Sequence, residues 1–368
     1  MKTQRNIIGI MSGTSLDGID AAMVEVHGVG LDIVVTPVRH CSCIIGSAAE
    51  ALAAMAHDEP MKTSTWATAR VAFSKQCAQL ANECASGTPA DLVVVHGQTV
   101  HHAPPSSIQL INAAVIVQQT SSPVLHDLRA ADLAAGGQGA PITPLADWIL
   151  FRDPEPTTVL NLGGFCNFTA LPSDQGGVHD LEGIVAGDIC ACNQLLDRAA
   201  RSLLDLDMDP EGSHAARGRC QPDVSRKIVD RLKEQFDQNR SLGSGDEGHD
   251  MLELLESIVD AKDALATLVD AVATTITDSI PADGQRLLLA GGGAFNEHLV
   301  HSIRSRWKGH VALTSEQGID VQAREAIAMA TLGALAMDDI PITLPQVTGR
   351  GTRVARDGCL TTTVARDH

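Results

Sequence analysis

Apolar and polar positions alternate in short blocks along the first part of the chain, and these blocks predict strands and helices in turn. Ile7–Met11 and Ile19–Val26 are apolar segments that flank the polar sequence SGTSLDG, a pattern that predicts a β-hairpin. Leu92–Val95 is a continuous apolar run of the kind found in buried strands. The other elements expected here are a strand at Val34–Ser42, alanine-rich helices at Ala49–His57 and Ser64–Ala85, and a continued α/β alternation at Val115–Gln119 and Val124–Leu125.

The same pattern starts again after Ala134–Pro144 (AAGGQGAPITP), the segment richest in glycine and proline, which predicts a domain boundary. Thr157–Leu162 and Phe165–Leu171 predict a second hairpin, turned by Gly163–Gly164. The apolar spacing then predicts helices at Asn193–Leu204, Lys262–Ile280, Asn296–Ser305 and Ala323–Met337, and a strand at Leu287–Ala290. Two α/β halves that each open with a hairpin indicate a duplicated fold with a cleft between the halves.

Composition and charge narrow the possible functions. The chain has 368 residues and a formal net charge of −18. No Lys- and Arg-rich stripe interrupts that balance, which argues against nucleic acid or an anionic membrane surface as a partner. The N-terminal segment is short and polar, and no apolar run approaches the ~20 residues of a transmembrane helix, so we expect neither a signal peptide nor a membrane span.

The cysteines are dispersed and odd in number, nine in all, which is typical of a protein from a reducing cytosol. Two C-x-C pairs, Cys41/Cys43 and Cys190/Cys192, lack the second pair and the histidines at the spacing of a zinc site. Small buried thiols are therefore the expected role of these pairs, and the sequence predicts a cytoplasmic protein.

Three glycine-containing turns lie at the ends of predicted strands: SGTSLDG (Ser12–Gly18), NLGGF (Asn161–Phe165) and AGGGAF (Ala290–Phe295). Glycine lets the backbone approach a phosphate and present N–H groups to it, hydroxyl side chains add donors, and aspartate can hold Mg²⁺ through water. Each turn alone is also compatible with an ordinary hairpin or strand-to-helix connection. Their occurrence together favours a phosphate-binding site, and the absence of G-x-x-x-x-G-K-[ST] excludes a P-loop kinase.

Six motifs follow one another in order over nearly the whole chain: IGIMSGTSLDGID, HGQTVHHAP, AAGGQGAP, NLGGFCNFT, GGGAFN and EQGID…REAIAMATL…LPQVTG. The two halves resemble the actin-like and sugar-kinase ATPase superfamily, and the ordered motifs are similar to those of the anhydro-N-acetylmuramic acid kinases. The resemblance implies an α/β fold of two related actin-like (ribonuclease H-like) domains flanking a nucleotide cleft. The expected boundaries are 1–133 with 340–368 for the N-terminal domain and its tail, and 134–339 for the C-terminal domain.

The resemblance implies that ATP binds at the three turns. The first turn would clasp the β- and γ-phosphates, the second would be another phosphate turn, and the third would face the adenosine. The residues implied are Gly13, Thr14, Ser15, Leu16, Asp17, Gly18, Ile19, Asp20, Asn161, Gly163, Gly164, Gly291, Gly292, Gly293 and Asn296. Asp17 and Asp20 would hold Mg²⁺ through water, or alternatively cap the hairpin turn.

The family's catalytic aspartate opens a stretch that usually resembles DTGPGN and precedes a helix. The matching stretch here is DICACN, which retains Asp188 and Asn193 and replaces the residues between them. The resemblance implies that Asp188 is the general base; an aspartate there can also be the N-cap of the following helix. Glu325 is an acid in an otherwise apolar helix, either at its surface end or in a cleft with a tuned pKa. The family pattern implies that Glu325 orients the sugar.

Four further residues are candidates for binding the sugar: His96, Gln98, Arg129 and Asn193. His96 and Gln98 follow a buried strand and would hydrogen-bond sugar hydroxyls, or alternatively satisfy the strand end. Arg129 would pair with the lactyl carboxylate of a muramic acid, or tie down its own loop through Asp132.

The function implied by the resemblance is that of an ATP- and Mg²⁺-dependent kinase of peptidoglycan recycling and amino sugar catabolism. It would hydrolyse the 1,6-anhydro bridge of 1,6-anhydro-N-acetylmuramic acid and phosphorylate O6, giving N-acetylmuramic acid 6-phosphate and ADP. The family also implies a homodimer. The alternatives are a kinase for another 1,6-anhydro sugar such as levoglucosan, and a non-catalytic actin-like nucleotide-binding protein.

Overall fold

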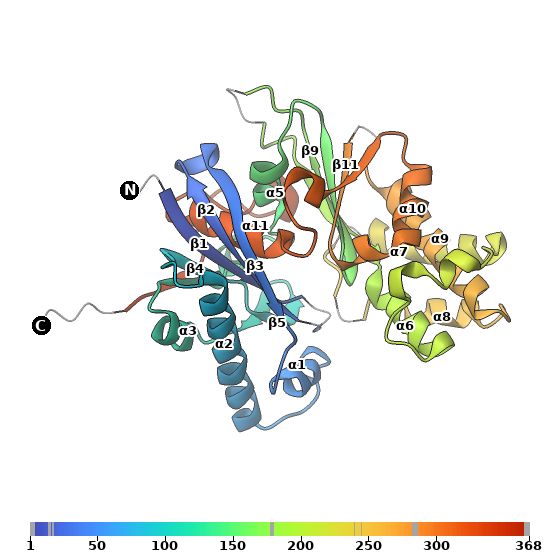
Figure 1. The fold of residues 1–368 in the computed structure, drawn as a ribbon, viewed down its shortest axis with the longest axis horizontal. Helices are drawn as coiled ribbons and strands as arrows, with labels where there is room; N and C mark the ends of the chain where they lie inside the picture. The colour runs from blue at the N-terminus through green and yellow to red at the C-terminus, as the bar shows by residue number, and fades with distance from the viewer. Residues whose placement is uncertain are drawn as a thin grey trace, which may run out of the picture. The chain divides into compact units, whose positions relative to one another are not determined.

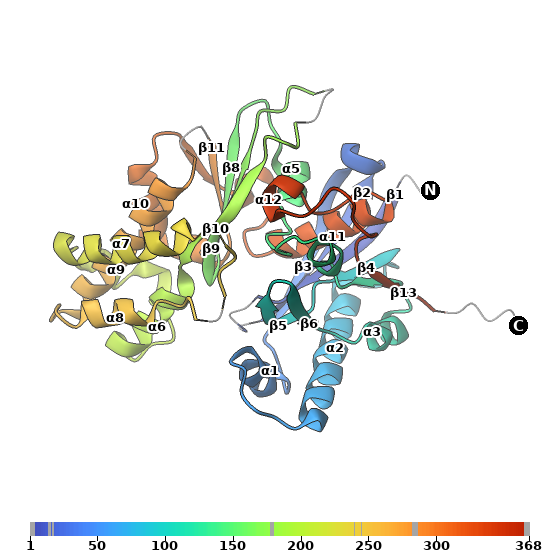
Figure 2. The same ribbon diagram turned by 180° about the vertical axis from the view of Figure 1, so that it is seen from behind.

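A computed structural model describes residues 4–13, 16, 18–176, 180–238, 240–243, 245–281 and 286–363 of the chain, which divides into two units. Unit 1 consists of Met1–Phe151 with Ala323–His368, and unit 2 consists of Arg152–Gln322. Figure 1 colours the chain by residue number, and Figure 2 shows it from behind. Unit 1 is therefore made from both ends of the chain, and unit 2 from one continuous segment.

Unit 1 is built on a six-stranded sheet of order β13-β7-β4-β1-β2-β3. In it β1, β2 and β3 form an antiparallel meander, β4 and β7 continue parallel to β1, and β13 pairs antiparallel with β7. Its strands are β1 (Gln4–Met11), β2 (Ile19–His27), β3 (Val34–Cys43), β4 (Leu92–Val95), β7 (Val124–His126) and β13 (Cys359–Thr361), with a separate hairpin of β5 (Gln98–Ala103) and β6 (Ser106–Leu110). Its helices are α1 (Ala49–Ala56), α2 (Thr63–Ala85), α3 (Ala113–Thr120), α4 (Ala130–Ala134), α5 (Pro144–Phe151), α11 (Arg324–Met337) and α12 (Pro345–Thr348).

Helices cover both faces of this sheet. On one face, Ile8 and Ile10 of β1 pack in one apolar cluster with Phe73 and Cys77 of α2. On the other face lies α11, which contacts β1, β2 and β4. The approach is close, because a Cβ atom on Gly9 would lie 1.9 Å from the carbonyl oxygen of Ala326. The glycine in the first strand is thus required by backbone packing against α11.

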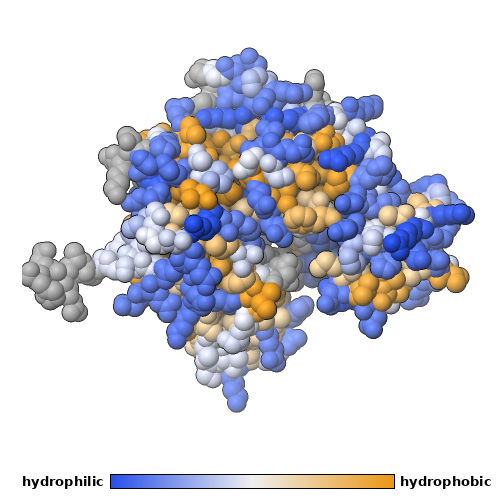
Figure 3. Space-filling model, viewed as in Figure 1, coloured by the Kyte–Doolittle hydropathy of each residue, from blue (hydrophilic) through white to orange (hydrophobic). Residues whose placement is uncertain are grey.

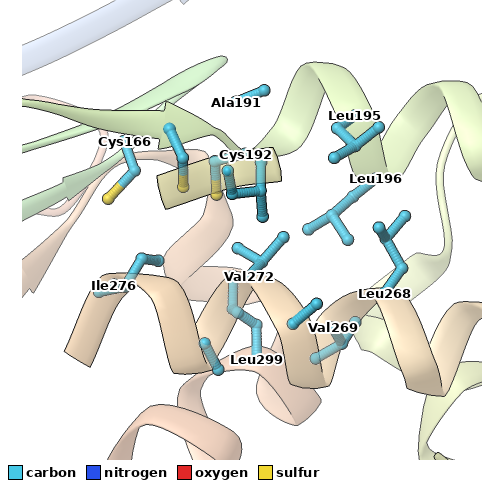
Figure 4. Close-up of a cluster of buried hydrophobic side chains, with 14 of the residues drawn as sticks. Cys166, Ala191, Cys192, Leu195, Leu196, Leu268, Val269, Val272, Ile276 and Leu299 are labelled. Atoms are coloured by element: carbon cyan, nitrogen blue, oxygen red, sulfur yellow. The ribbon is translucent and has the colours of Figure 1, made fainter. Parts of the chain in front are cut away.

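Unit 2 has a five-stranded sheet of order β10-β9-β8-β11-β12, again an antiparallel meander followed by two strands parallel to its first member. Its strands are β8 (Thr157–Leu162), β9 (Phe165–Leu171), β10 (Val185–Ala191), β11 (Arg286–Ala290) and β12 (His310–Leu313). Its helices are α6 (Asn193–Leu204), α7 (Pro222–Asp237), α8 (His249–Leu255), α9 (Ala261–Ser279) and α10 (Glu297–Arg306). Leu268, Val272 and Ile276, spaced four residues apart on α9, point into the apolar cluster beneath the sheet (Figure 4).

The two units repeat one topology. Sheet order β3-β2-β1-β4-β7 in unit 1 corresponds to β10-β9-β8-β11-β12 in unit 2, with the same pattern of directions, and unit 1 adds β13 at the edge. This confirms the predicted α/β fold of two related domains, and both predicted hairpins are present. The elements that the pattern did not predict include α5, β10, α7 and β12.

The boundaries between the units differ from the predicted ones. They lie after Phe151 and Gln322, where 133 and 339 were expected. The physical reason is that α5 packs against α11, and α11 packs against the sheet of unit 1. The glycine-rich segment is also a packed loop: a Cβ atom on Gly137 would lie 2.2 Å from Oδ2 of Asp132.

The surface is mixed in character. Figure 3 shows hydrophobic residues among hydrophilic ones on the face where β3 lies. Val34 and Val38 of this edge strand are among the exposed apolar residues. Among the described residues, no helix has the length and apolar composition that crossing a membrane would require.

Replacing Gly9 by alanine is expected to destabilise unit 1 by about 3 kcal/mol, because the new Cβ collides with the backbone of α11. Urea unfolding followed by tryptophan fluorescence measures the effect, since Trp148 is fully buried in unit 1. Gly46→Ala is the control, because its Cβ would lie 3.5 Å from the nearest atom, on Gln76. This substitution should change the free energy of unfolding by less than about 0.5 kcal/mol. Equal effects of the two substitutions would contradict the close approach of β1 and α11.

Candidate functional site

The first glycine turn is held by a buried amide. Gln98, at the start of β5, is fully buried, and its Nε2 donates to the carbonyl oxygens of Gly13 (3.1 Å) and Thr99 (3.3 Å). Ser12 Oγ lies 2.7 Å from Gln98 Oε1 and 2.8 Å from the carbonyl oxygen of Gly18, and can donate its one hydrogen to either. Gln98 therefore holds the first end of the turn, at Ser12 and Gly13, a role that the sequence did not indicate.

The remaining residues of this turn are described only in part. Thr14, Ser15 and Asp17, predicted to bind ATP, lie outside the described residues. Leu16 has a φ of 58° and its N–H donates to the carbonyl oxygen of Gly13. Ile19 and Asp20 begin β2.

Several acidic and basic side chains of unit 1 interact with one another near the end of the first turn. The Asp20 carboxylate hydrogen-bonds His40 Nε2 at 2.8 Å, and Glu325 lies in the first turn of α11. Burial raises the pKa of Glu325; Arg324 and Arg129 lower it, while Asp20 and Asp147 raise it. The half-buried Glu325 is thus within electrostatic reach of Asp20 and Arg129, two other predicted site residues.

A buried ion pair fixes the start of α11. The side chains of Arg324 and Asp147 are 1% and 0% exposed and are joined by two hydrogen bonds, including Nε to Oδ1 at 2.9 Å. At the other end of the helix, Arg5 binds both carboxylate oxygens of Asp338, at 2.7 and 3.0 Å. Because Glu325 is adjacent to Arg324, the first pair also sets the position of the candidate carboxylate. Sequence reasoning missed this pair, whose members are 177 residues apart.

His96 and Arg129 form one hydrogen-bonded unit. His96 is buried; its Nδ1 lies 2.8 Å from the carbonyl oxygen of Gly97, and its Nε2 lies 3.0 Å from Nε of Arg129. Burial and the neighbouring Arg129 lower the pKa of His96 to about 3, so the ring is neutral. It donates from Nδ1 and accepts at Nε2, the tautomer that these two partners require.

Arg129 is tied to the glycine-rich loop. Its Nη1 donates to the carbonyl oxygen of Gly139 at 2.5 Å. The Asp132 carboxylate also binds Gly139, accepting from its backbone N–H at 2.7 Å. The same carboxylate accepts from Thr348 Oγ1 at 2.7 Å. The loop contact thus goes through Gly139, and the carboxylate-binding alternative for Arg129 stays a prediction.

In unit 2, the second glycine turn is held by the start of α6. The backbone N–H of Cys192 donates to the carbonyl oxygen of Gly164 (2.9 Å), and that of Asn193 donates to Gly163 (3.1 Å). The side chain of Asn193 adds a bond from Nδ2 to the carbonyl oxygen of Leu162 at 3.0 Å. Asn193, predicted to bind sugar, therefore supports the turn between β8 and β9.

The third glycine turn lies against the same backbone. A Cβ atom on Gly291, which has a φ of +82°, would lie 2.8 Å from the carbonyl oxygen of Leu162 and from Oδ1 of Asn161. One on Gly293 would lie 2.8 Å from Cβ of Leu162 and from Oδ1 of Asn193. The second and third turns, with Asn161, Gly163, Gly164 and Gly291–Gly293, thus form one continuous backbone surface.

Asn296, the last predicted ATP-binding residue, is the N-cap of α10. Its Oδ1 accepts from the N–H of Leu299 at 2.9 Å. The side chain of Asn296 therefore caps the helix.

Asp188 lies within β10, half-buried, opposite Asn167 of β9 and beside a β-bulge. Its Oδ2 accepts from the backbone N–H of Leu242 at 2.8 Å. The N-cap of α6 is Cys192, so the alternative that Asp188 caps this helix is wrong. The strand continues through DICA to Ala191, and the carboxylate is carried by a strand rather than by a turn.

The cysteines near Asp188 belong to the apolar core. Figure 4 shows Cys166 and Cys192 in the cluster above α9, and Cys190 belongs to the same cluster. Burial raises the pKa of all three thiols, that of Cys192 to about 12, so they stay protonated. Within the described parts of the chain, no group of three or more His, Cys, Asp or Glu side chains is placed to hold a metal ion.

Comparison with known proteins identifies one family along the chain. The family model for anhydro-N-acetylmuramic acid kinase matches residues 5–361. A curated anhydro-N-acetylmuramic acid kinase from Salinibacter ruber is 32% identical over 96% of this chain and 95% of its own length. One from Acaryochloris marina is 35% identical over 94% of this chain and 96% of its own length.

Two of the solved structures that match the chain have low sequence identity to it. The activator of 2-hydroxyisocaproyl-CoA dehydratase from Clostridium difficile, with bound ADPNP, has a TM-score of 0.45 and 12% identity, covering 91% of this chain and 96% of its own. A ROK family glucokinase from Streptomyces griseus, in complex with glucose and AMPPNP, has a TM-score of 0.39 and 13% identity, covering 89% and 98%.

The two neighbouring glycines of the third turn are expected to differ in their tolerance of a methyl group. Gly293→Ala should destabilise unit 2 by about 2 kcal/mol, since its Cβ meets Leu162 and Asn193 at 2.8 Å. Calorimetry should then show the unfolding temperature of unit 2 lowered by about 4–8 °C. Gly292→Ala is the control, because its Cβ would lie 3.8 Å from Asn193 Nδ2. A similar decrease in both variants would argue against the packed turn.

Proposed function

The chain belongs to the anhydro-N-acetylmuramic acid kinase family, and from this membership we propose that it uses ATP to phosphorylate 1,6-anhydro-N-acetylmuramic acid. The products are N-acetylmuramic acid 6-phosphate and ADP, as in peptidoglycan recycling. The observation that carries the proposal is the half-buried carboxylate of Asp188, placed on β10 just before the helix whose Asn193 holds the glycine turn of unit 2. A cytoplasmic location and a homodimer, implied by the family, belong to this proposal.

The glycine turns fit a nucleotide. Gly163, Gly164, Gly291 and Gly293 offer backbone without side chains, as a phosphate or an adenosine approaching the main chain needs. In unit 1, Gly13 and Gly18 lie at the two ends of the first turn, and Gln98 binds the carbonyl oxygen of Gly13. ATP supplies the γ-phosphoryl group as the second substrate.

Mg²⁺ would be held from unit 1 through water. Asp20 offers a carboxylate whose side chain is 36% exposed, an oxygen ligand of the kind that Mg²⁺ prefers. With Asp17, which lies outside the described residues, it would place the ion at the first turn. Positive charge and backbone N–H groups there offset the charge that spreads over the transferring phosphoryl oxygens.

Asp188 acts as the general base on water. In the substrate O6 is bonded to C1 and carries no proton, so deprotonating a sugar hydroxyl cannot start the reaction. Asp188 takes a proton from a water molecule, and the water oxygen forms a bond to C1 as the C1–O6 bond breaks. O6 takes the phosphoryl group, and ADP leaves. Attack opposite the bridge inverts the configuration at C1.

Arg129 and Glu325 are the groups proposed to orient the sugar. Gln98 uses its amide for the first turn, and His96 uses both ring nitrogens for Gly97 and Arg129, so neither is offered primarily to a substrate. Arg129 is a cation, held at Nε and Nη1, that would pair with the lactyl carboxylate of the sugar. Levoglucosan has no such carboxylate, and this favours the muramic acid.

Asp188→Asn should keep ATP binding and lose product formation by ~10³-fold or more, as loss of a general base can cause. An assay of ADP release with 1,6-anhydro-N-acetylmuramic acid measures turnover, and equilibrium dialysis measures ATP affinity. The same assay with levoglucosan tests the alternative sugar. Turnover of neither sugar by the unaltered protein would refute the anhydro-sugar assignment, and full activity of the variant would refute the role of Asp188.

Reaction in ¹⁸O-labelled water should place the label at C1 of the product, because the attacking oxygen comes from water. Mass spectrometry of the sugar phosphate after a short reaction measures it. A parallel incubation of unlabelled product in the labelled water corrects for exchange at the anomeric carbon. Product that carries no label beyond this correction would mean ordinary phosphorylation of a hydroxyl group.

A further inference from the structure

A surface ion pair lies close to Asp188, in the segment that follows α7. Arg240 and Asp246 are joined by two hydrogen bonds, Nη1 to Oδ2 at 2.7 Å and Nη2 to Oδ1 at 2.6 Å. The Asp246 side chain is only 14% exposed, and its Oδ2 also accepts from the N–H of Gly243 at 2.9 Å. Burial raises the pKa of Asp246, but the hydrogen bonds from Arg240 and Gly243 more than offset this and leave it below its usual value.

The segment is also attached to the strand that carries Asp188. Gln235 of α7 donates from Nε2 to the carbonyl oxygen of Asp246 at 2.7 Å, and its Oε1 accepts from the N–H of Ala191 at 3.1 Å. One side chain thus joins the segment to β10, three residues beyond Asp188. The ion pair and this bridge together fix the path of the backbone from Arg240 to Gly243.

On this path Leu242 presents its N–H to Asp188. The bond to Oδ2 is 2.8 Å long, and a backbone N–H that donates to a carboxylate favours the charged form. We propose that Arg240 and Asp246 are positioning residues for Asp188: their ion pair holds Leu242 so that its N–H orients the carboxylate. The proposal rests on the proposed function, in which Asp188 must be ionised to accept a proton.

Arg240 and Cys166 are among the titratable groups that interact with Asp188. The first is Arg240: the hydrogen bonds that it donates to Asp246 raise its pKa, and the charge of Asp188 raises it further, so the positive charge of Arg240 favours the Asp188 carboxylate in return. The second is Cys166 of β9. Burial and the neighbouring cysteines raise the pKa of its thiol, so this thiol stays neutral. The positive charge of Arg240 and the N–H of Leu242 therefore both favour the ionised form of Asp188.

The test compares Arg240→Gln and Asp246→Asn with a control in the same unit. Each variant should lower kcat by about 10-fold and move the acid limb of the kcat/KM profile about 0.5–1 pH unit higher, while KM for the sugar stays within about twofold. The pH shift follows because loss of the oriented N–H disfavours the carboxylate. Lys233→Gln breaks an exposed ion pair with Asp278, whose side chains are 40% and 49% exposed, and should change neither quantity.

A charge exchange keeps the test valid if a single variant folds poorly. The double variant Arg240→Asp with Asp246→Arg can remake the pair and should recover kcat and the acid limb in part. Wild-type kcat and an unmoved acid limb in both single variants would overturn the proposal, as would a double variant no better than the singles when far-UV circular dichroism shows all of them folded.

A measurement without substrate separates this proposal from the proposed function. In protein labelled with ¹⁵N-leucine, the amide resonance of Leu242 should titrate with Asp188, lose that titration in Asp188→Asn, and titrate at higher pH in Arg240→Gln. A Leu242 amide that does not follow Asp188 overturns the positioning role even in an active enzyme. If the unaltered protein shows no turnover but the Leu242 amide still titrates with Asp188, the proposed function is overturned instead.

Discussion

Backbone packed against backbone, with no room for a Cβ atom, is the constraint on which both units depend. In unit 1, Gly9 brings β1 against the carbonyl oxygen of Ala326 and so lets α11 lie on the sheet. In unit 2, Gly291 and Gly293 bring the third turn against Leu162. Gly291 and Gly293, two of the glycines that suggested phosphate binding, are thus required by packing before any ligand arrives. A nucleotide would use a bare backbone surface that the fold already has to make.

Buried polar side chains then serve the main chain rather than a substrate. Gln98 holds the first end of the first turn, and Asn193 supports the second turn, each through hydrogen bonds to backbone carbonyl oxygens. His96 is neutral and holds Arg129. The catalytic proposal therefore concentrates on three charged groups, Asp188, Glu325 and Arg129, and on the contacts that orient them. Rigid support of this kind is what precise catalytic geometry requires.

The sequence predicted the strands and the duplicated topology because their apolar periodicity is local. Leu92–Val95 and Thr157–Leu162 are strands with the predicted bounds. By contrast, β10 carries Gly187 and the half-buried Asp188, which break the apolar pattern of a strand. The pairing of Arg324 with Asp147 could not be read from the chain, because it depends on how α5 and α11 pack. The same holds for Leu242 and Asp188, 54 residues apart.

The position of α11 in the chain has a consequence for synthesis. This helix covers one face of the unit 1 sheet, yet it follows the whole of unit 2 in sequence. As the ribosome releases the chain from its N-terminus, unit 2 is a continuous segment that can fold as soon as it emerges. Strands β1 to β7 of unit 1, made long before, keep the apolar face around Val94, which Gly333 of α11 later contacts, uncovered until then. Unit 1 therefore stays incomplete while the ribosome synthesises unit 2. During this period a chaperone can bind the exposed apolar face.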